Sequence, residues 1–388
     1  MKKKTFALLG STGSIGKTSL SVINKLKNTK VELIFADKNF REIIKQIKIF
    51  RPRVVIVNSL KTFTKLKNIF KNNKIIILND YKKSKKYLKK IDVTISAIPG
   101  IKGLEPTIFF IEISKKILIA NKESVICGWN LIKAKAKKFN TKFIPIDSEH
   151  FSINYLLNHF PKKEIKKIYI TASGGPFLNF KKNYFNKIKP HQAIKHPKWK
   201  MGKKISIDSA TLMNKVLEVI EALKLFNLSS ENIEILVHPQ SLVHSILELK
   251  NGLKVFLYHK NDMKIPILNA IETKKYYLKI FDFDKNIIEK NLTFLNVDKK
   301  KFPVVDLLKK INIKNSSPIL INAANEVLVD KFLNKNISFN DISKYLKLFL
   351  DDKKYIKTSK IKPNSINKVK KVDFLGREIA FRIVDKHA

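Results

Sequence analysis

The amino-acid sequence predicts an α/β protein with an N-terminal doubly wound parallel sheet, a central α+β region and a C-terminal helical bundle. Three observations support this fold class. Short apolar segments alternate with helical patterns over residues 1–150, as expected for a parallel sheet covered by helices. The dipeptide Asn251-Gly252 joins two strand-like segments, which is typical of an antiparallel hairpin. Helical patterns dominate from about Phe302 onward.

The N-terminal part is expected to form a sheet of the Rossmann-like kind. Its apolar segments are separated by amphipathic patterns, among them one helix that ends near Leu26 and another over residues 41–50. Such helices cross over a sheet and return the chain to a parallel neighbouring strand. The strands are expected at residues 4–9, 31–36, 54–57, 75–78, 93–97, 117–120 and 143–146.

Gly10, Gly13 and Gly16 lie between the first strand and the first helix. Their spacing is related to the G-x-G-x-x-G fingerprint without matching it. Glycines at such a turn let the backbone approach a pyrophosphate, which the N–H groups at the helix start then bind. A tight strand-to-helix turn also needs glycine without any ligand. We favour a dinucleotide site, because the turn follows the first strand of an alternating βα region.

The residues after the second strand bear on the choice of dinucleotide. An acidic side chain there favours the ribose hydroxyls of NAD, and a basic one favours the 2′-phosphate of NADP. The chain has Asp37 followed by Lys38 and Asn39, so the two indications compete. Lys38 can hold the phosphate, whereas Asp37 repels it if both side chains point the same way.

The pattern changes after residue 150, where the spacing predicts an α+β region with antiparallel strands. Residues 286–301 read as a linker between this region and the helical C-terminal part. The strands are expected at residues 168–172, 233–237, 243–249 and 253–258. The C-terminal helices include residues 318–333, 338–348 and 377–384.

The formal net charge of +46 is compatible with nucleic-acid binding. Only five of the 78 basic residues are arginine, the residue most used for base readout and bidentate phosphate contacts. The lysines are scattered through every segment instead of forming one stripe. A general compositional bias therefore explains them, and no specific nucleic-acid partner is expected. The charge should still steer anionic metabolites toward the protein.

The cysteine content and the apolar runs predict a soluble, cytoplasmic protein with no membrane partner. Cys127 is the one cysteine, so no intramolecular disulfide can form. The apolar run Phe6–Leu9 is too short for the core of a signal peptide. No apolar run reaches the roughly 20 residues of a membrane span.

Two carboxylates follow the last strand of the N-terminal part. Asp147 and Glu149 are two residues apart, so on an extended segment their side chains point to the same side. Ser148 lies between them and can turn toward a ligand. Paired carboxylates of this kind suit Mg²⁺ or Mn²⁺. The alternative is a solvated loop, which the motif alone does not exclude.

A helix predicted from about Ala210 to Leu225 adds to this pair. It places Asn214 and Glu218 on one face at i, i+4, with Lys215 three residues before Glu218. Glu218 can supply a third oxygen ligand, and Asn214 and Lys215 can bind phosphate oxygens. Ser209 adds a hydroxyl near the helix start. The alternative is an exposed helix face with a surface ion pair.

Two further segments carry polar or aromatic groups suited to a bound anion. Ser173 and the two glycines after it follow a strand and can wrap an anion, although they can equally form an ordinary loop. His196 and Trp199 lie in a segment without clear periodicity, which suits a lid that excludes water. The alternative makes Trp199 a packing anchor. His238 and His244 lack a usual zinc spacing and are interpreted as structural polar groups.

The order and spacing of several motifs resemble those of the 1-deoxy-D-xylulose 5-phosphate reductoisomerase family. The resemblance covers most of the chain. The motifs are Gly10-Ser-Thr-Gly-Ser-Ile-Gly16, Ala120-Asn-Lys-Glu-Ser124, Asp147-Ser-Glu-His150, Ala172-Ser-Gly-Gly-Pro-Phe177, the block from His196 to Glu218, His238-Pro-Gln-Ser241 with His244, and Asn322-Ala-Ala-Asn-Glu326. Asp37 departs from the family pattern, because a small glycine is usual at its position.

The resemblance implies a role for each matching residue. The implied metal ligands are Asp147, Glu149 and Glu218. The implied catalytic residues are Lys122, Glu149, His196 and Glu218. The implied substrate-binding residues are Lys122, Ser148, Glu149, Ser173, His196, Trp199, Ser209, Asn214, Lys215 and Glu218. The implied cofactor-binding residues are Thr12, Gly13, Ser14, Ile15, Asp37, Lys38, Asn39, Asn121, Glu123 and Gly202.

The family resemblance also implies an activity and an assembly. The cofactors would be NADPH and a divalent metal, which is Mg²⁺, Mn²⁺ or Co²⁺. The small phosphorylated sugar 1-deoxy-D-xylulose 5-phosphate would be rearranged and reduced to 2-C-methyl-D-erythritol 4-phosphate by a homodimer. The expected parts are an NADPH-binding domain at 1–147, a catalytic and dimerisation domain at 148–285 with a substrate loop near 173–203, the linker at 286–301, and a helical domain at 302–388.

Two other functions compete with this one. A plain NAD(P)-dependent dehydrogenase would share the N-terminal fold and perform no rearrangement, but it would not require three carboxylates together with Ser173, Asn214 and Lys215. A nucleic-acid-binding protein would concentrate its basic residues in one stripe, which the scattered lysines contradict.

Overall fold

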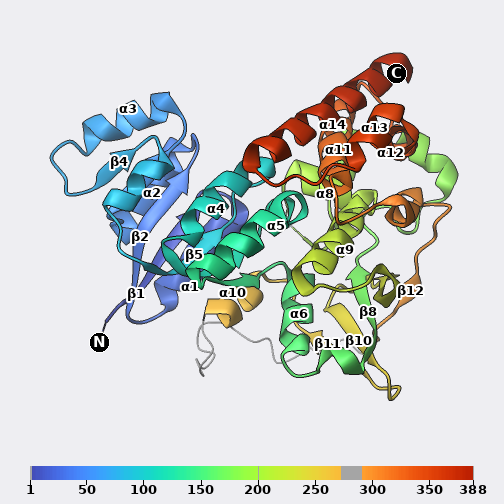
Figure 1. The fold of residues 1–388 in the computed structure, drawn as a ribbon, viewed down its shortest axis with the longest axis horizontal. Helices are drawn as coiled ribbons and strands as arrows, with labels where there is room; N and C mark the ends of the chain where they lie inside the picture. The colour runs from blue at the N-terminus through green and yellow to red at the C-terminus, as the bar shows by residue number, and fades with distance from the viewer. Residues whose placement is uncertain (1, 200, 272–290, 388) are drawn as a thin grey trace. The chain divides into compact units, whose positions relative to one another are not determined.

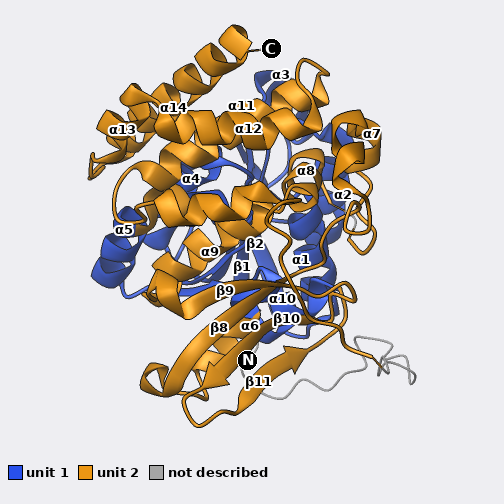
Figure 2. Cartoon of the chain, turned by 90° about the vertical axis from the view of Figure 1, so that its right-hand side faces the viewer, with its two compact units in different colours: residues 1–124, 130–151, 262–287 blue, residues 125–129, 152–261, 288–388 orange. Residues whose placement is uncertain are grey.

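The computed structural model describes residues 2–199, 201–271 and 291–387. The chain divides into two compact units, coloured separately in Figure 2. Unit 1 comprises residues 1–124, 130–151 and 262–287, and unit 2 comprises residues 125–129, 152–261 and 288–388. The predicted boundary between residues 285 and 286 lies outside the described residues. The predicted domain limits therefore stay predictions.

Unit 1 contains a sheet of seven strands, and every neighbouring pair in it is parallel. The seven strands predicted for the N-terminal part are all present. They are β1 (Lys4–Leu9), β2 (Thr29–Ala36), β3 (Val54–Val57), β4 (Ile76–Leu78), β5 (Ile91–Ser96), β6 (Ser114–Ile119) and β7 (Lys142–Pro145). The helices of this unit are α1 (Ser14–Lys25), α2 (Phe40–Phe50), α3 (Leu60–Ile69), α4 (Leu104–Ile111) and α10 (Lys264–Ile271).

Helices cover this sheet on both faces, and the burial of β1 shows why its residues form a strand. Phe6 and Leu8 belong to one buried cluster, together with residues of α1 and α10. Ala7 and Leu9 point the other way into a second cluster with Phe110. Successive side chains of a strand alternate between faces. An uninterrupted apolar segment is therefore what a doubly covered parallel strand requires.

The strand order β4-β3-β2-β1-β5-β6-β7 reverses direction between β1 and β5. The chain first winds outward from β1 to β4, then returns to β5 and winds outward on the other side. In open parallel sheets the crevice outside the carboxyl ends of the strands at such a reversal is the usual ligand site. The glycine turn that follows β1 begins at this point.

Unit 2 contains a five-stranded sheet in the order β11-β10-β8-β9-β12. The Asn251-Gly252 hairpin is confirmed, with Gly252 at a φ of 92° between antiparallel β10 and β11. The predicted antiparallel pairing is confirmed for three strand pairs, whereas β8 and β9 pair in parallel. A crossover through the helices α8 (Lys203–Ala210) and α9 (Met213–Phe226) permits that pairing. The strands are β8 (Ile165–Ala172), β9 (Ile233–Val237), β10 (Val243–Leu249), β11 (Lys254–Tyr258) and β12 (Leu295–Asn296).

The C-terminal helices form the predicted bundle within unit 2, drawn in orange and red in Figure 1. Helices α5 (Lys122–Phe139) and α6 (Ser148–Leu157) contain residues of both units. The helices of unit 2 are α7 (Pro190–Ala193), α8 (Lys203–Ala210), α9 (Met213–Phe226), α11 (Ser317–Leu333), α12 (Phe339–Asp351), α13 (Lys353–Ser359) and α14 (Ile366–His387), with the short 3-10 helices η4 (Lys182–Lys187) and η6 (Pro303–Lys310).

The helix predicted from Ala210 to Leu225 is interrupted, and that prediction is wrong at its start. Ala210 ends α8, and α9 begins only at Met213. Between them Leu212 adopts the left-handed conformation with a φ of 62°, which costs an L-residue about 1–2 kcal/mol. Leu212 is buried. The surrounding core therefore holds a turn that helical periodicity alone does not reveal.

An aromatic cluster joins the segment after Ser173 to the helical bundle. The Phe339 ring at the start of α12 lies 5.4 Å from Phe177, 5.7 Å from Phe185 and 5.6 Å from Phe332, measured between ring centroids. All three pairs are edge-to-face or nearly so, an arrangement that adds to the gain from burial alone. This packing attaches the chain between β8 and α8 to the C-terminal bundle.

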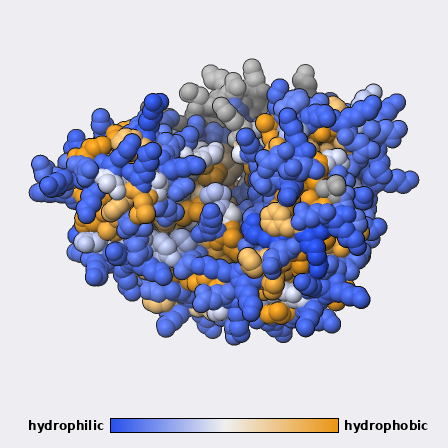
Figure 3. Space-filling model, turned by 90° about the horizontal axis from the view of Figure 1, so that it is seen from above, coloured by the Kyte–Doolittle hydropathy of each residue, from blue (hydrophilic) through white to orange (hydrophobic). Residues whose placement is uncertain are grey.

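Hydrophilic residues cover most of the face shown in Figure 3, with hydrophobic residues in smaller patches. Within the described ranges, every helix is too short or too polar to cross a membrane.

Replacing Phe339 by alanine should lower the free energy of unfolding by about 3–5 kcal/mol, because it leaves a cavity among several aromatic rings. Phe374→Ala on α14 is the matched control: its side chain is 60% exposed, against 3% for Phe339, and a loss within about 0.5 kcal/mol is expected. Chemical denaturation followed by circular dichroism measures both. Equal losses in the two variants would contradict the proposed anchoring role.

Candidate active site

The glycine turn after β1 is closely packed against the backbone. A Cβ at Gly10, whose φ is 89°, would lie 2.6 Å from the Ala97 carbonyl oxygen, and a Cβ at Gly16 would lie 2.6 Å from the Ser11 carbonyl oxygen. Helix α1 begins directly after Gly13, with no side-chain cap and no acidic residue in its first turn. Its first N–H groups therefore face the carboxyl edge of the sheet with no carboxylate to compete for an anion.

The residues after β2 are exposed, and one of them has a structural role. The Asn39 side chain caps α2 by accepting a hydrogen bond from the Glu42 backbone N–H at 3.2 Å. Asp37 and Lys38 both lie at the surface beside it. Their exposure leaves either side chain able to turn toward a ribose or a phosphate.

Asn121 fixes the start of α5 after β6. Its side-chain oxygen accepts the Ser124 N–H at 2.5 Å, and its amide donates to the carbonyl oxygens of Gly100 at 3.0 Å and of Ile98. These bonds connect the loop after β5 to the residues that follow β6. Lys122 and Glu123, the next two residues, are both buried.

A cluster of acidic and basic groups lies at the carboxyl end of β7. The Lys122 ammonium is 3.0 Å from an Asp147 carboxylate oxygen, and oxygens of Asp147 and Glu149 lie within 4.8 Å of each other. The Ser148 hydroxyl donates to Glu149 at 2.6 Å. The extended segment predicted here is wrong, because α6 already begins at Ser148. The two carboxylates approach each other through the turn into that helix.

A second charged cluster lies at the start of α9, within unit 2. The Lys215 ammonium donates to Glu218 at 2.6 Å, and the Asn214 amide donates to the other oxygen of the same carboxylate. The predicted shared helix face of these three residues is confirmed. Lys215 and Glu218 are both nearly fully buried, so the alternative of a surface ion pair is wrong. A buried carboxylate requires such donors, because its desolvation is costly.

The turn after β8 places Ser173 beside the end of α8. Gly174 and Gly175 have φ values of 81° and 67°, and the Gly175 N–H donates to the Ser173 hydroxyl at 3.2 Å. A Cβ at Gly175 would lie 3.0 Å from the Ser209 carbonyl oxygen, so the two segments are in close contact. Ser209 lies in the last turn of α8 and not at a helix start, which corrects its predicted position.

His196 is held in one tautomer. Its Nδ1 accepts the backbone N–H groups of Trp199 at 2.9 Å and Lys198 at 3.1 Å, so the proton resides on Nε2. That nitrogen lies 3.0 Å from the Ser173 hydroxyl oxygen and donates to it. Burial, and to a smaller extent the positive charge of Lys215, lower the pKa of His196 to about 4. The imidazole is therefore neutral near pH 7.

The chain after His196 contacts a pair of stacked histidines. The Trp199 ring lies 6.2 Å from His244, which in turn stacks on His259 with ring centroids 4.2 Å apart. His238 stacks on Phe294, and its Nδ1 donates to the Thr293 carbonyl oxygen at 2.8 Å. Gly202, the predicted cofactor contact, is the N-cap of α8.

A buried acid next to Ser209 connects α8 to the C-terminal bundle. The Asp208 carboxylate accepts the Asn325 amide of α11 at 2.7 Å and lies 3.0 Å from the Lys204 ammonium. Asp208 is 1% exposed and Asn325 is fully buried. The two helices are thus joined by a desolvated polar bond, which is costly to break.

The structure brings together most of the predicted residues within each unit. In unit 1 these are Lys122, Asp147, Ser148 and Glu149. In unit 2 they are Ser173, His196, Ser209, Asn214, Lys215 and Glu218. Sequence analysis did not single out His150, whose Nδ1 lies 3.9 Å from Asp147, or the Asp208–Asn325 pair. The i, i+3 spacing of His150 from Asp147 was the one available signal.

Three family models match the chain in consecutive segments. Residues 6–128 match the model of 1-deoxy-D-xylulose 5-phosphate reductoisomerase. Residues 143–226 match the C-terminal domain of 1-deoxy-D-xylulose 5-phosphate reductoisomerase, and residues 259–379 match the DXP reductoisomerase C-terminal domain. Together the matches include the glycine turn, both charged clusters and the helical bundle.

Relatives and solved structures agree with these models over nearly the whole chain. The 1-deoxy-D-xylulose 5-phosphate reductoisomerase of Pelagibacter ubique is 43% identical, with 97% of this chain and 99% of the relative covered. That of Thermodesulfovibrio yellowstonii is 40% identical over 97% and 98% of the two chains. A crystal structure of DOX-P reductoisomerase with NADPH, fosmidomycin and magnesium has a TM-score of 0.89 at 31% identity, covering 98% of each chain. The Zymomonas mobilis enzyme with NADPH has a TM-score of 0.88 at 31% identity, covering 99% of this chain and 100% of that one.

The lowered pKa of His196 predicts a pH dependence of stability. The ordinary pKa of histidine, about 6.5, applies to the unfolded chain, and the pKa of His196 in the native protein is about 4. Between about pH 6.5 and about pH 4 the unfolded chain thus binds a proton at His196 that the native protein does not. Stability should therefore fall as pH falls through this window. The pH dependence should be shallower in His196→Gln, measured by denaturation at several pH values.

Histidine NMR provides the direct measurement. The His196 resonance is identified by its absence from the spectrum of His196→Gln. Its chemical shift should remain that of a neutral imidazole down to about pH 5, since the native pKa of His196 is about 4. An imidazolium signal appearing between pH 6 and 7 would contradict the assignment of the neutral tautomer.

Proposed function

This chain belongs to the 1-deoxy-D-xylulose 5-phosphate reductoisomerase family, and we infer on that premise that it converts 1-deoxy-D-xylulose 5-phosphate into 2-C-methyl-D-erythritol 4-phosphate. It is an NADPH-dependent, metal-binding oxidoreductase of isoprenoid biosynthesis. The observation that carries this function is the 43% identity to the Pelagibacter relative over 97% of the chain, because the match includes both the dinucleotide part and the carboxylate-bearing part. A plain dehydrogenase has no need of the second.

We propose Asp147, Glu149 and Glu218 as the metal ligands. The donor chemistry fits, because carboxylate oxygens are the preferred ligands of Mg²⁺ and Mn²⁺. Asp147 and Glu149 present oxygens within 4.8 Å of each other, a limit that includes the roughly 4.2 Å between opposite oxygens on one Mg²⁺. Asn214 and Lys215 orient Glu218. When bound, the divalent cation supplies a Lewis acid for the ketone of the substrate.

The phosphate of the substrate is assigned to the polar groups near the end of α8. We propose that Ser173, Ser209, Asn214 and Lys215 bind it, since hydroxyl, amide and ammonium donors converge there. Lys215 brings a positive charge into a buried site, which strengthens its attraction for a phosphate. Binding of this remote group favours closure of the segment around His196 and Trp199 over the reacting carbons.

The remaining substrate contacts are assigned by their positions. Lys122 and Ser148 contact the carbon chain of the substrate, and Glu149 lies next to them. The neutral His196 donates its Nε2 proton to a hydroxyl in the present structure, and the same N–H can be offered to a substrate oxygen. Trp199 excludes water when its segment closes. Lys122, Glu149, His196 and Glu218 are proposed as the catalytic residues.

The cofactor is assigned to the carboxyl edge of the sheet in unit 1. The closely packed glycine turn and the uncapped start of α1 fit a pyrophosphate. When bound, NADPH supplies the hydride that reduces the rearranged aldehyde. We assign the 2′-phosphate to Lys38, with the Asp37 carboxylate pointing away from that phosphate. The proposed contacts are Thr12, Gly13, Ser14, Ile15, Asp37, Lys38, Asn39, Asn121, Glu123 and Gly202.

Two further properties follow from family membership. We propose that the protein is a homodimer, which sedimentation velocity at assay concentration tests; a monomer with full activity would contradict it. We also propose a cytoplasmic location, consistent with the single, buried cysteine, Cys127, which rules out a disulfide within the chain. Cell fractionation with the enzyme in a membrane or exported fraction would contradict that proposal.

The proposed function is tested by NADPH oxidation at 340 nm with 1-deoxy-D-xylulose 5-phosphate, with and without Mg²⁺ or Mn²⁺. Oxidation is expected only with the metal. Repeating the assay with NADH ranks the two cofactors, and Asp37→Gly should favour NADPH more strongly because it removes a charge that repels the 2′-phosphate. If the folded, metal-loaded protein oxidises neither cofactor, the proposed function is wrong and the dehydrogenase alternative is favoured instead.

Glu218→Gln should abolish turnover and leave NADPH binding nearly unchanged, because the substitution removes a metal-ligand charge without touching the cofactor part. Turnover is read at 340 nm, and cofactor binding by the change in NADPH fluorescence. The matched control is Glu231→Gln on the exposed surface after α9, which should retain both properties. Turnover like that of the wild type in Glu218→Gln would remove this residue from the ligand set.

A further inference from the structure

A pocket lined by lysines lies in the helical part of unit 2, between η4, the segment that contains η6, and α12. Its volume is about 330 Å³. Six of its 11 lining residues are lysine, whereas 73 lysines among 388 residues would place about two in a set of that size. They are Lys182, Lys300, Lys301, Lys310, Lys344 and Lys347. None of the residues proposed for substrate, cofactor or metal lines this pocket.

The acidic groups near the pocket do not neutralise it. Asp306 is the one acidic lining residue, and its carboxylate lies 3.8 Å from Lys299 and 3.7 Å from Lys309, which are outside the lining. Lys310 pairs with Asp351 at 2.9 Å.

Among the residues that the structure describes, Lys310 is the one pocket lysine with an acidic partner, and the other five have none. Lys301 donates to the Leu178 carbonyl oxygen at 2.8 Å, and Lys344 lies over the Tyr345 ring at 5.8 Å. For Lys182, Lys300 and Lys347, the described part of the chain supplies no carboxylate within ion-pair distance. Ammonium groups gathered in this way repel one another, so a bound anion relieves an unfavourable interaction as well as forming a favourable one.

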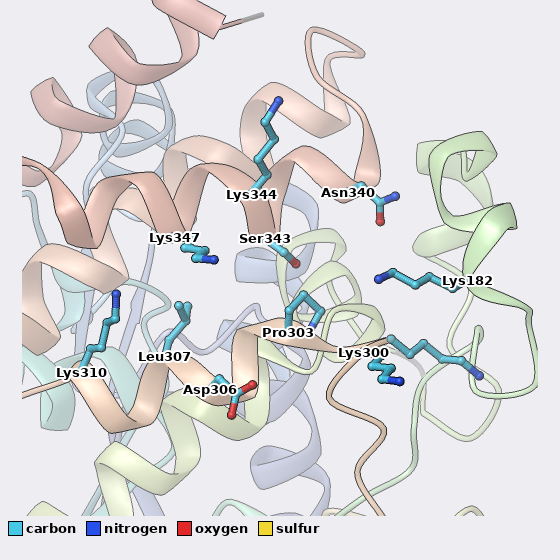
Figure 4. Close-up of a pocket in the computed structure, with 11 residues that line it drawn as sticks. Lys182, Lys300, Pro303, Asp306, Leu307, Lys310, Asn340, Ser343, Lys344 and Lys347 are labelled. Atoms are coloured by element: carbon cyan, nitrogen blue, oxygen red, sulfur yellow. The ribbon is translucent and has the colours of Figure 1, made fainter.

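The polar lining suits an anion with several oxygens. Figure 4 shows Lys182 extending from the η4 side toward Asn340 and Ser343 of α12, which add an amide and a hydroxyl to the lining. The lysine ammonium is a compact charge with three rotatable N–H donors, unlike the fixed planar arrangement of arginine. It can therefore donate hydrogen bonds to oxygens at varied angles. At roughly 30 Å³ per water molecule, the volume of about 330 Å³ exceeds the space that one phosphate fills.

We propose that this pocket binds a compact polyanion with a di- or triphosphate chain, at a site separate from the proposed active site. A chain of two or three phosphates offers Lys182, Lys300 and Lys347 more negative charge and more oxygens than a single phosphate does. The same chemistry is present in inorganic oligophosphates and in nucleoside triphosphates. The site lies beside the aromatic cluster of Phe177, Phe185 and Phe339, because Phe302 and Phe339 flank its lining residues in the chain.

The test is isothermal titration calorimetry of the full-length protein with inorganic tripolyphosphate, at about 150 mM salt to screen the general surface charge. Saturating NADPH is present to fill the cofactor site. One saturable event is expected in the wild type, and orthophosphate should bind at least 10-fold more weakly. Adenosine triphosphate and adenosine are titrated in parallel: binding of the triphosphate but not of inorganic tripolyphosphate would overturn the proposal that the phosphate chain is the recognised part.

A matched pair of variants separates this pocket from general charge. The triple substitution of Lys182, Lys300 and Lys347 by alanine should weaken tripolyphosphate binding at least 10-fold. The control replaces Lys357, Lys362 and Lys371, which are exposed elsewhere in unit 2, by alanine. It has the same change in net charge and should weaken tripolyphosphate binding less than twofold. Equal weakening in both variants would overturn the proposal. Turnover should match that of the wild type in both, so failure here is distinguishable from failure of the proposed function.

Discussion

A carboxylate can be buried only where cations or hydrogen-bond donors compensate its desolvation, and the functional part of this chain is organised by that requirement. The buried Glu218 is held by Lys215 and Asn214, and the buried Asp208 by Lys204 and Asn325. Asp147, which is half-buried, is held by the buried Lys122. In each case the compensating donors come from the same unit as the acid. Each of these carboxylates is therefore oriented by donors of its own unit, so little side-chain entropy is left to lose when it binds a ligand.

Those buried pairs also distinguish two kinds of lysine in a chain with a net charge of +46. Lys122 and Lys215 are less than 10% exposed and each contacts a specific carboxylate. Most of the other lysines are exposed, where an ion pair contributes at most about 1 kcal/mol. The excess charge consequently matters less for folding than for the local potential, which attracts phosphorylated molecules to the surface.

Backbone strain contributes to the same organisation. Leu212 has a φ of 62° between α8 and α9, and Gly174 and Gly175 have positive φ values after β8. These reversals bring the end of α8 against the Ser173 turn while the start of α9 presents Asn214 and Lys215. The strain is offset by burial of Leu212 and by the Asp208–Asn325 bond to α11. Strained residues of this kind often lie at functional sites, where a fixed geometry is required. The C-terminal bundle thus supports the residues proposed to bind substrate without contributing one of them.

The sequence by itself determined the seven parallel strands, the Asn251-Gly252 hairpin, the C-terminal helices and the helical spacing of Asn214, Lys215 and Glu218, because periodicity, turn residues and i, i+4 geometry are local properties. Its motifs were also sufficient to indicate the family. Only the tertiary structure decided the break at Leu212, the parallel pairing of β8 with β9, the turn that brings Asp147 toward Glu149, and the neutral tautomer of His196. The break at Leu212 and the pairing of β8 with β9 depend on contacts between residues distant in the chain, and the neutral state of His196 depends on its burial. The turn after Asp147 and the bonds to the His196 Nδ1 are local, but they follow no periodic pattern that the sequence shows.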